Sequence, residues 1–402
     1  MCYIIDIREV HYMEIDCKEF GYRFLENNTV EFYCDKSLYP EILKSEDMYV
    51  TGSFNGWLTT GDSSWKMELL SVNKNPYYSL IKSIDSVKIP GNSGFPEFKF
   101  FRLSETGFNL IEEDETKRPN IFLKNKIILF DDEDYEKMRY YQNHNEFEKK
   151  LADFDLNCPA CRAEISNFRL VPGTKCLFRG YHPYKKSRSY MDTEDERINL
   201  VQKAMELYGI KSDITLSGYE KPYDFLGEEM PDYMKKIEDK NNRLCVDIDY
   251  NLVYFHSDAA EYSNVLRTIS LFMLNHPGPF YIHCRLGSDR TGVTSAVFAS
   301  LCGASWQEIS EDFEKTTHCG INEVRDKRIL QYSLKRMIGF DPTSSKDLAS
   351  LMQRYFIKEE ILKPKEIEKL VHKLNIPCRK KETDYFDFTG NHICAKKKAN
   401  IL

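Results

Sequence analysis

The segment from Pro279 to Leu301 constrains the fold more strongly than any other part of the chain. Residues 279–283 (Pro-Phe-Tyr-Ile-His) have the composition of a buried strand, and residues 293–301 have that of an apolar helix. A strand and a helix that are both apolar must each be covered by other elements, as in a layered α/β domain. The short loop between them, residues 284–292, is therefore expected to be held between two buried elements.

This loop has the composition of an anion-binding site. Cys284 and Arg290 are six positions apart, and the backbone N–H groups between them can converge on a tetrahedral anion at the N-terminus of the following helix. The helix end and Arg290 favour the thiolate form of Cys284, which is its nucleophilic form. The planar guanidinium of Arg290 can bind two phosphoryl oxygens at once. The residues expected to form the phosphate-binding loop are Arg285, Leu286, Gly287, Ser288 and Asp289.

The pattern His-Cys-x5-Arg-Thr-Gly at positions 283–292 resembles the signature of the cysteine-based protein-tyrosine and dual-specificity phosphatase superfamily. The resemblance implies a phosphomonoester hydrolase in which Cys284 attacks phosphorus and water then hydrolyses the phosphocysteine intermediate. It implies that Arg290 binds the phosphate and the transition state, and that Thr291 stabilises the leaving thiolate. His283 is expected to orient the loop, with a purely structural role in the core as the alternative. No metal and no cofactor are expected.

The family also implies a general acid, an Asp on a loop that precedes the cysteine in the chain. Asp258 is the first candidate, because it lies on a predicted loop before a predicted helix. Asp289 is the alternative, since relatives with Asp-Arg-Thr-Gly have a carboxylate inside the phosphate-binding loop, where it can act as the acid or order the arginine. Asp247 and Asp249 are further alternatives, in a segment whose alternation resembles a strand with one solvated face.

Around this loop the sequence alternates between predicted helices and strands, which indicates an α/β fold with a central, mostly parallel sheet. Residues 165–340 are expected to form the phosphatase domain, and residues 341–402 a helical extension and tail. Ser305 to Glu308 is a capping box that opens a helix. The predicted helices are 195–208, 227–240 and 261–274, and the predicted strands are 211–216, 243–255 and 279–283.

The resemblance to the superfamily extends to segments outside the loop. Asn167-Phe168-Arg169 and Cys176 to Gly180 resemble the opening segments of bacterial and fungal members, and Asp312-Phe313 stands where those members have Asp-Tyr. Arg179 is expected to be either a supporting contact of the loop or an ordinary structural arginine. Ser217-Gly218 departs from the family, which commonly has an arginine there.

Residues 1–130 have a different composition. Short runs rich in Tyr, Val, Ile and Phe are separated by Asn, Gly and Pro, which predicts an all-β sandwich of the carbohydrate-binding or immunoglobulin-like kind. Residues 131–164 begin with four acidic residues and continue with helical spacing, and we interpret them as a linker. Cys158 and Cys161 in this linker have no second cysteine pair that would complete a zinc site.

The run Gly52-Ser53-Phe54-Asn55-Gly56-Trp57 resembles the strand and turn of glycogen-binding modules such as that of the AMP-activated protein kinase β subunit. Sugar binding needs an exposed aromatic face and a few polar groups. Trp57 is expected either to form such a platform or to pack against a neighbouring surface, and Trp65 is expected to fill the core. The candidate carbohydrate-binding residues are Trp57, Lys99, Phe108 and Asn120.

Composition excludes several classes of protein. The chain has 402 residues and a net charge of -7, and it has no basic stripe interleaved with aromatic residues, so nucleic-acid binding is not expected. No uncharged apolar run reaches the ~18 residues of a membrane span, and Asp6 and Arg8 come too early for a signal peptide. A cytoplasmic protein is therefore expected.

The sequence leaves the substrate open among three readings. A phosphorylated protein, as for a protein-tyrosine or dual-specificity phosphatase, is the first. A phosphorylated glucan or an inositol phosphate is the second, although the residues between Cys284 and Arg290 lack the Ala-Gly of known glucan phosphatases. The third is a carbohydrate-binding scaffold with weak activity, for which glycogen or a starch-like glucan would be the partner.

Overall fold

The computed structural model describes residues 20–35, 47–72, 75–104, 107–110, 125–143, 148–378 and 385–386. The chain divides into two compact units, Met1–His144 and Asn145–Leu402. The division falls inside residues 131–164, the segment that the sequence marks as a linker.

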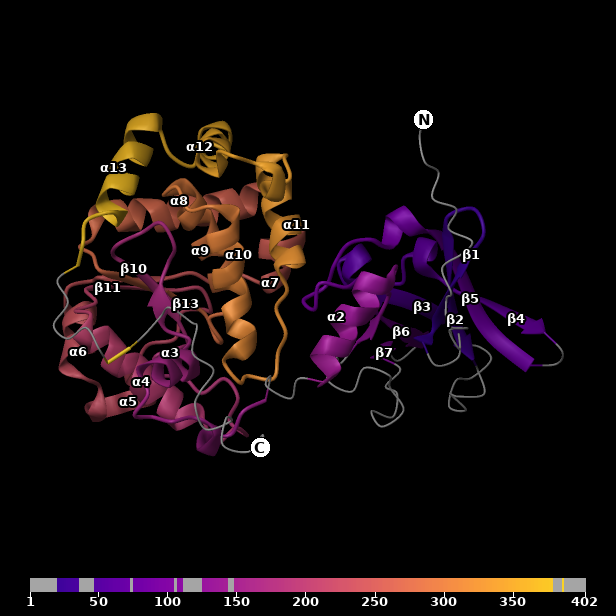
Figure 1. The fold of residues 1–402 in the computed structure, drawn as a ribbon, viewed down its shortest axis with the longest axis horizontal. Coiled ribbons are helices and arrows are strands. Elements are labelled where there is room, and N and C mark those ends of the chain that lie inside the picture. Colours follow the sequence, from indigo (N-terminus) through magenta and orange to yellow (C-terminus); the bar gives the residue numbers. More distant parts are fainter. Residues whose placement is uncertain are drawn as a thin grey trace. The chain divides into compact units, whose positions relative to one another are not determined.

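The first unit contains two antiparallel β-sheets (Figure 1). One has the strand order β1-β2-β5-β4, and the other has the order β3-β6-β7 with β8 paired to β6. The strands are β1 Tyr22–Leu25, β2 Thr29–Asp35, β3 Asp47–Gly52, β4 Glu68–Val72, β5 Asn75–Ser83, β6 Glu97–Ser104, β7 Gly107–Leu110 and β8 Lys126–Ile127, and helix α2 spans Asp132–Asn143.

Alternate residues of these strands form the core of the first unit. Val30 and Phe32 of β2 meet Val50 of β3 and Phe98 and Phe100 of β6 in one buried cluster. Successive side chains of a strand point to opposite faces, so the alternation seen in the sequence places every second residue inside. The two antiparallel sheets agree with the all-β class expected for residues 1–130.

The second unit is built on one five-stranded sheet with the order β12-β11-β13-β10-β9. Neighbouring strands are parallel from β12 to β10, and only β9 is antiparallel to its neighbour. The segment expected to be a buried strand is β13, at the centre of this sheet. The strands are β9 Arg169–Leu170, β10 Leu177–Gly180, β11 Ser212–Thr215, β12 Arg243–Cys245 and β13 Phe280–His283.

Helices cover both faces of the sheet. In Figure 1, α3, α4, α5 and α6 lie on one side of the strands, and α8, α9, α12 and α13 lie on the other. The helices are α3 Pro159–Ser166, α4 Glu194–Leu207, α5 Tyr223–Leu226, α6 Asp232–Asp239, α7 Tyr250–Phe255, α8 Ala260–Asn275, α9 Asp289–Leu301, α10 Trp306–Glu314, α11 Lys327–Ile338, α12 Leu348–Lys358 and α13 Pro364–Leu374. The predicted capping box is present, since Ser305 and Glu308 exchange hydrogen bonds at the start of α10.

The strand predicted over 243–255 is wrong for most of its length. Only Arg243–Cys245 is a strand, and Tyr250–Phe255 is helix α7. Asp249 caps this helix, because its carboxylate accepts a hydrogen bond from the Asn251 N–H at 2.7 Å. The apolar run from Leu252 to Phe255 is buried, so it lacks the polar positions that would have revealed a helical period.

The carboxyl ends of the parallel strands lie at one edge of the sheet. Gly180 of β10 and Thr215 of β11 are both in register with His283 of β13, and Thr215 is in register with Cys245 of β12. The loops that follow these strands therefore surround the segment after His283, which is the usual place for a ligand in an open α/β sheet. Of the helices that the structure describes, none is long and apolar enough to cross a membrane.

Candidate active site

The segment 284–288 lies between the central strand β13 and helix α9, so the loop that the sequence predicts between a strand and a helix is present, with the helix beginning earlier, at Asp289. Cys284 is only 2% exposed, and every residue of α9 from Thr291 to Leu301 is buried. Because α9 begins at Asp289, its N-terminus adjoins the loop and favours negative charge there.

Three successive carbonyl groups of the loop accept hydrogen bonds from outside it. The Arg285 carbonyl accepts from the hydroxyl of Ser187 at 3.1 Å and from the N–H of His182 at 3.3 Å. The Leu286 carbonyl accepts from Asn167 Nδ2 at 2.9 Å, and the Gly287 carbonyl accepts from Arg179 Nη2 at 2.7 Å.

The N–H groups of the same loop are differently placed. Among the described residues, the backbone N–H groups from Arg285 to Arg290 donate to no protein acceptor. Buried backbone donors are normally satisfied, so a row of unsatisfied ones is suited to an oxyanion. The hydroxyls of Ser288 and Thr291 are also buried without a partner in the described part of the chain. The Thr291 hydroxyl is therefore free to donate to another group.

Gly287 lies close against the end of β10. It has φ +69°, and a Cβ at this position would lie 2.2 Å from the Gly180 carbonyl oxygen and 2.9 Å from Asn167 Nδ2. Both the left-handed backbone and the lack of space require glycine.

Arg290 is held by the two neighbouring loops. Its Nη1 donates to the carbonyls of Leu216 and Ile248, each at 3.2 Å. These carbonyls follow β11 and β12, so the guanidinium spans the edge of the sheet. The remaining Nε and Nη2 form the pair of donors that matches a phosphoryl group.

His283 is fully buried and contacts Cys284 directly. Its Nδ1 lies 3.3 Å from the Cys284 carbonyl oxygen, and its Nε2 lies 3.2 Å from Asp213 Oδ1. The ring of His182 packs edge-on against it, with 4.7 Å between the ring centroids. These contacts are suited to orienting the loop.

The two acid candidates of the sequence occupy different surroundings. Asp289 accepts from Arg325 Nε at 2.5 Å and Nη2 at 3.0 Å, and from the Tyr254 hydroxyl at 2.7 Å. Burial opposes the ionisation of Asp289, but Arg325 and Tyr254 outweigh it and hold its pKa below the ordinary value. A carboxylate that is ionised and fully bonded is a poor proton donor.

Asp258 is bound to Arg336 of α11, with Oδ1 2.6 Å from Nη2 and 3.0 Å from Nε. Arg336 lies nine positions after Lys327, the first residue of α11, which is about 14 Å along the helix axis. Arg325 lies just before Lys327 and binds Asp289 beside the loop. The structure therefore brings Asp289 to the loop and leaves Asp258 near the other end of α11.

The alternatives Asp247 and Asp249 belong to a segment that binds Arg290. They flank Ile248, whose carbonyl binds Arg290, and Asp247 pairs with Ser217 in an isolated bridge. Asp249 caps α7. Asp247 is exposed, and its carboxylate has no hydrogen-bond or ion-pair partner among the described residues.

The candidate sugar residues belong to the first unit. Trp57 is part-exposed with φ +57°, and its N–H donates to the Gly52 carbonyl. Gly52 pairs with Phe98, the neighbour of Lys99, so Trp57 and Lys99 lie at the same end of β3 and β6. Phe108 is in β7, and Asn120 lies outside the described residues. Within the described ranges, no cluster of three or more His, Cys, Asp or Glu side chains is arranged to hold a metal ion.

Sequence reasoning missed most of the groups that hold the loop from behind. The sequence points to Asn167, Arg169 and Asp312 only through the family resemblance. It gives no sign of His182 or Arg325. Arg179 is the exception, because the sequence already offers it as a supporting contact of the loop. Its place inside the apolar strand Leu177-Phe178-Arg179-Gly180 is a further signal, since a charged residue there is rarely buried without a partner.

We expect Gly287→Ala to weaken binding of orthovanadate, a tetrahedral oxyanion, by at least about tenfold, because an added Cβ must displace either the loop or Gly180. Isothermal titration calorimetry measures the affinity. Gly209→Ala is the matched control, since Gly209 also has positive φ but has no atom within 4 Å of the added Cβ. Equal affinities in the two variants would contradict the close-contact interpretation.

The match to a protein family agrees with this geometry. Residues 194–374 match the model of the tyrosine phosphatase family. No curated protein matches the chain. Among solved structures, the chain is similar to the core catalytic domain of the PP-IP phosphatase SIW14 from S. cerevisiae, crystallised with citrate, at 16% identity over 49% of this chain and 94% of that one, with a TM-score of 0.25. The family match and the loop between β13 and α9 identify the second unit as a cysteine-based phosphatase.

Proposed function

We propose that this phosphatase acts on phosphate esters of aromatic side chains in proteins, that is, on phosphotyrosine. The observation that carries the proposal is a rim of exposed aromatic residues on the segments that follow β10, β11 and β12, the strands whose carboxyl ends adjoin the phosphate-binding loop. The aromatic rim consists of Tyr190, Tyr219, Tyr223, Phe225 and Tyr250.

The aromatic rim accounts for five of the eight large apolar side chains that are exposed in the described part of the second unit. Contacts join the loops that carry it. Tyr184 packs against Phe225 at 5.6 Å between ring centroids and donates to the Glu220 carbonyl, and Gly218 donates to the Val246 carbonyl. Exposed aromatic groups around a site are typical of surfaces that bind another molecule.

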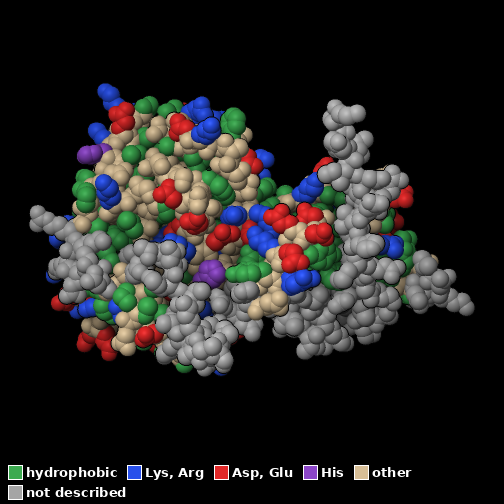
Figure 2. Space-filling model, in the orientation of Figure 1, with side chains coloured by type: hydrophobic (Ala, Val, Ile, Leu, Met, Phe, Trp, Pro, Cys, Tyr) green, Lys and Arg blue, Asp and Glu red, His purple; other side chains and the backbone are tan. Residues whose placement is uncertain are grey.

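The charge of the same loops argues against a densely phosphorylated substrate. Loops 181–193, 216–222 and 246–250 together with Arg285 carry five basic and four acidic residues, a net charge of +1. Three of the basic residues, Lys185, Lys186 and Arg188, already pair with carboxylates. On the face that Figure 2 shows, basic, acidic and apolar side chains of the second unit are interspersed. An inositol polyphosphate would need a concentration of positive charge.

The chemistry proposed for the site has two steps. The Cys284 thiolate attacks phosphorus, an S–P bond forms as the P–O bond to the substrate breaks, and the leaving oxygen takes a proton from a general acid. Water then attacks phosphorus, gives its proton to the same carboxylate, and the S–P bond breaks. Arg290 and the free N–H groups of the loop bind the phosphoryl oxygens in both steps, and Thr291 donates to the departing thiolate.

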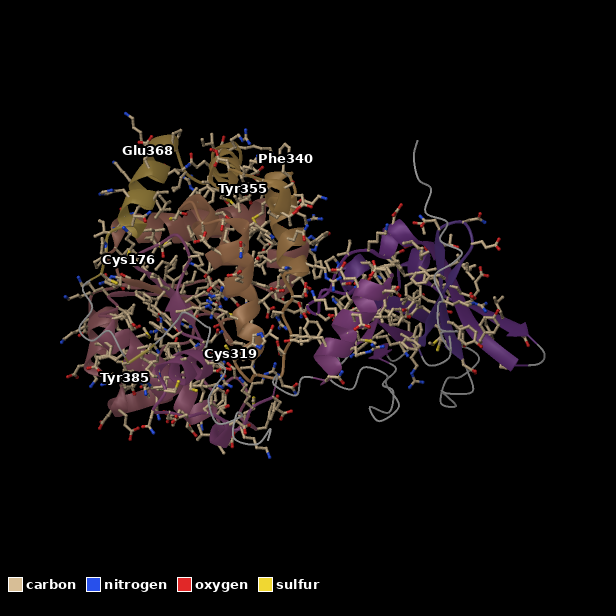
Figure 3. The ribbon with its side chains drawn as sticks, viewed as in Figure 1. Cys176, Cys319, Phe340, Tyr355, Glu368 and Tyr385 are labelled. Atoms are coloured by element: carbon tan, nitrogen blue, oxygen red, sulfur yellow. The ribbon has the colours of Figure 1, made fainter. Side chains whose placement is uncertain are left out.

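A substrate panel tests the proposal. Wild type should hydrolyse a phosphotyrosine peptide with a higher kcat/KM than a phosphoserine peptide, amylopectin phosphate or an inositol polyphosphate, and Cys284→Ser should hydrolyse none of them. Tyr219→Ala should raise KM for the phosphotyrosine peptide about 2- to 12-fold, because an aromatic contact contributes ~0.5–1.5 kcal/mol. Phe340→Ala is the matched control, since Phe340 is also exposed and lies beyond α11 (Figure 3). Preference for the inositol polyphosphate would reject the proposal.

For the general acid, the contacts support Asp247 over Asp258 and Asp289. Asp289 is bonded to Arg325, and Asp258 is bonded to Arg336. Asp247 stands next to the Ile248 carbonyl that binds Arg290, and its Oδ1 lies 4.0 Å from where a Cβ of Gly218 would be. These contacts support Asp247 as the acid, because it is exposed and adjoins a residue that binds Arg290.

Asp247→Asn should slow phenyl phosphate about 100-fold or more but 2,4-dinitrophenyl phosphate only slightly, because the second leaving group is stable without a proton. Steady-state rates of both variants, Asp247→Asn and Asp258→Asn, on both esters decide between them. If only Asp258→Asn shows the dependence on the leaving group, the Asp258 loop must move to the site during turnover and Asp247 is not the acid.

A second function, glucan binding by the first unit, is favoured by the contrast between two tryptophans. Trp65 is covered on both faces, by Phe54 stacked at 4.9 Å between ring centroids and by the Lys82 ammonium 4.5 Å from the ring centroid. Trp57 has no aromatic or cationic partner among the described residues and is part-exposed. A part-exposed indole ring beside a turn, without an aromatic or cationic partner in the described part of the chain, is suited to stacking on a sugar.

We expect Trp57→Ala to abolish co-sedimentation with glycogen and to leave the melting temperature and the rate on para-nitrophenyl phosphate unchanged. Trp65→Ala is the comparison. Removing its ring from between Phe54 and Lys82 should lower the melting temperature, since truncating a buried Trp costs ~3–5 kcal/mol and Trp65 is partly buried. Wild-type protein that never sediments with glycogen, together with a lowered melting temperature for Trp57→Ala, would assign Trp57 to packing.

A further inference from the structure

Two buried arginines share one buried carboxylate beneath the phosphate-binding loop. Arg169 of β9, Arg179 of β10 and Asp312 of α10 are 5%, 0% and 6% exposed. Arg169 Nε lies 2.5 Å from Asp312 Oδ1, and Arg179 Nη1 lies 2.7 Å from Asp312 Oδ2. We call these three residues the buried triad.

The buried triad reaches the loop by two routes. Arg179 donates directly to the Gly287 carbonyl at 2.7 Å. Arg169 donates to the Asn167 carbonyl at 3.0 Å, and Asn167 Nδ2 donates to the Leu286 carbonyl at 2.9 Å. Asp312 fixes both guanidinium groups, so the direction of two successive loop carbonyls depends on it. Turning these carbonyls away from the anion leaves the N–H groups of the loop to face it.

The charges of the buried triad do not cancel. Burial lowers the pKa of Arg179 to about 10, which leaves it charged at neutral pH. Burial opposes ionisation of Asp312, but Arg169 and Arg179 hold its pKa below the ordinary value. Two cations and one anion leave one positive charge where water cannot screen it, and such a charge is costly unless a negative group balances it.

The Cys284 thiolate and a phosphate bound in the loop would be negative groups that balance this charge. Arg179 interacts electrostatically with Cys284. The other charged or titratable groups near the buried triad are Lys315, which interacts with Asp312, and Cys319, whose pKa burial raises to about 11 (Figure 3). Those near Cys284 are Tyr254, Tyr281, His283, Arg285, Arg290 and the Asp289–Arg325 pair. Arg179 is the arginine among these that contacts both Asp312 and the loop.

We propose that Arg179 and Asp312 are positioning residues: with Arg169 they fix the carbonyls of the loop and supply a net positive charge beneath Cys284 that supports its thiolate and the bound phosphate. The proposal rests on Cys284 being the nucleophile, but it does not depend on which phosphate ester is the substrate.

The test compares three buried residues by the pH dependence of Cys284 alkylation with iodoacetamide, which reacts with the thiolate. Mass spectrometry of the Cys284 peptide separates this thiol from the other cysteines. Arg179→Met removes the charge and retains an unbranched side chain. It should move the half-maximal pH of alkylation upward by about one unit, which lowers the rate about tenfold at acidic pH.

Asp312→Asn should move the half-maximal pH in the opposite direction, because it removes the negative charge and leaves both arginines. The sign is decisive, since general loosening of the fold would move both variants the same way. Arg197→Met is the matched control. Arg197 is also fully buried, but it donates to the carbonyls of Ile165 and Cys319 and does not touch the loop.

Vanadate affinity gives a second readout on the same proteins. Arg179→Met should bind vanadate at least about tenfold more weakly than Arg197→Met. Arg179→Lys should keep the pH profile of alkylation but bind vanadate less tightly than wild type, because an ammonium retains the charge without the paired donors of a guanidinium. If Arg179→Met does not fold, Asp312→Asn decides alone, and an upward or absent shift overturns the proposal. Alkylation and vanadate binding equal to those of Arg197→Met also overturn it. Failure of wild type on phosphotyrosine would remove only the substrate assignment.

Discussion

The contact between Gly180 and Gly287 is the constraint on which the rest of the site depends. Strands β10 and β13 are parallel neighbours, with Gly180 in register with His283. After His283 the chain must turn back over β10 before α9 begins, and it does so with Gly287 in contact with the Gly180 carbonyl. This close approach brings the loop within reach of Arg179, Asn167 and His182, which then bind its carbonyls.

Electrostatics around the loop follow a single pattern. Two carboxylates next to it are bound by arginines: Asp289 by Arg325, and Asp312 by Arg169 and Arg179. Because these anions are neutralised by the protein, the N-terminus of α9, Arg290 and the free N–H groups of the loop remain for an external anion. A loop that contains Asp289 can therefore still bind phosphate.

The sequence predicted the parts of the site that are contiguous in the chain. The strand, the loop and the helix from residue 279 to residue 301 follow from local composition, and the capping box at Ser305 follows from four residues. Arg169 and Asp312 are separated by 143 positions, and Arg325 and Asp289 by 36, so no local pattern reveals either pair. The general acid could not be chosen from the distance between each Asp and Cys284 in the sequence. The argument against Asp258 depends on its ion pair with Arg336 near the far end of α11, which the sequence does not reveal.

Under the proposed function, recognition of the substrate is divided between the floor of the site and its rim. The floor carries net positive charge and free N–H groups in a dry environment, where an anion is bound strongly whatever its carrier. The aromatic rim is nearly neutral and solvated, so it adds little electrostatic attraction and discriminates by apolar contact. Because Cys284 is buried at 2% exposure, the ester must extend from the rim to the floor before it can react. A rigid, flat group between phosphate and backbone meets that requirement at a lower entropy cost than a flexible one.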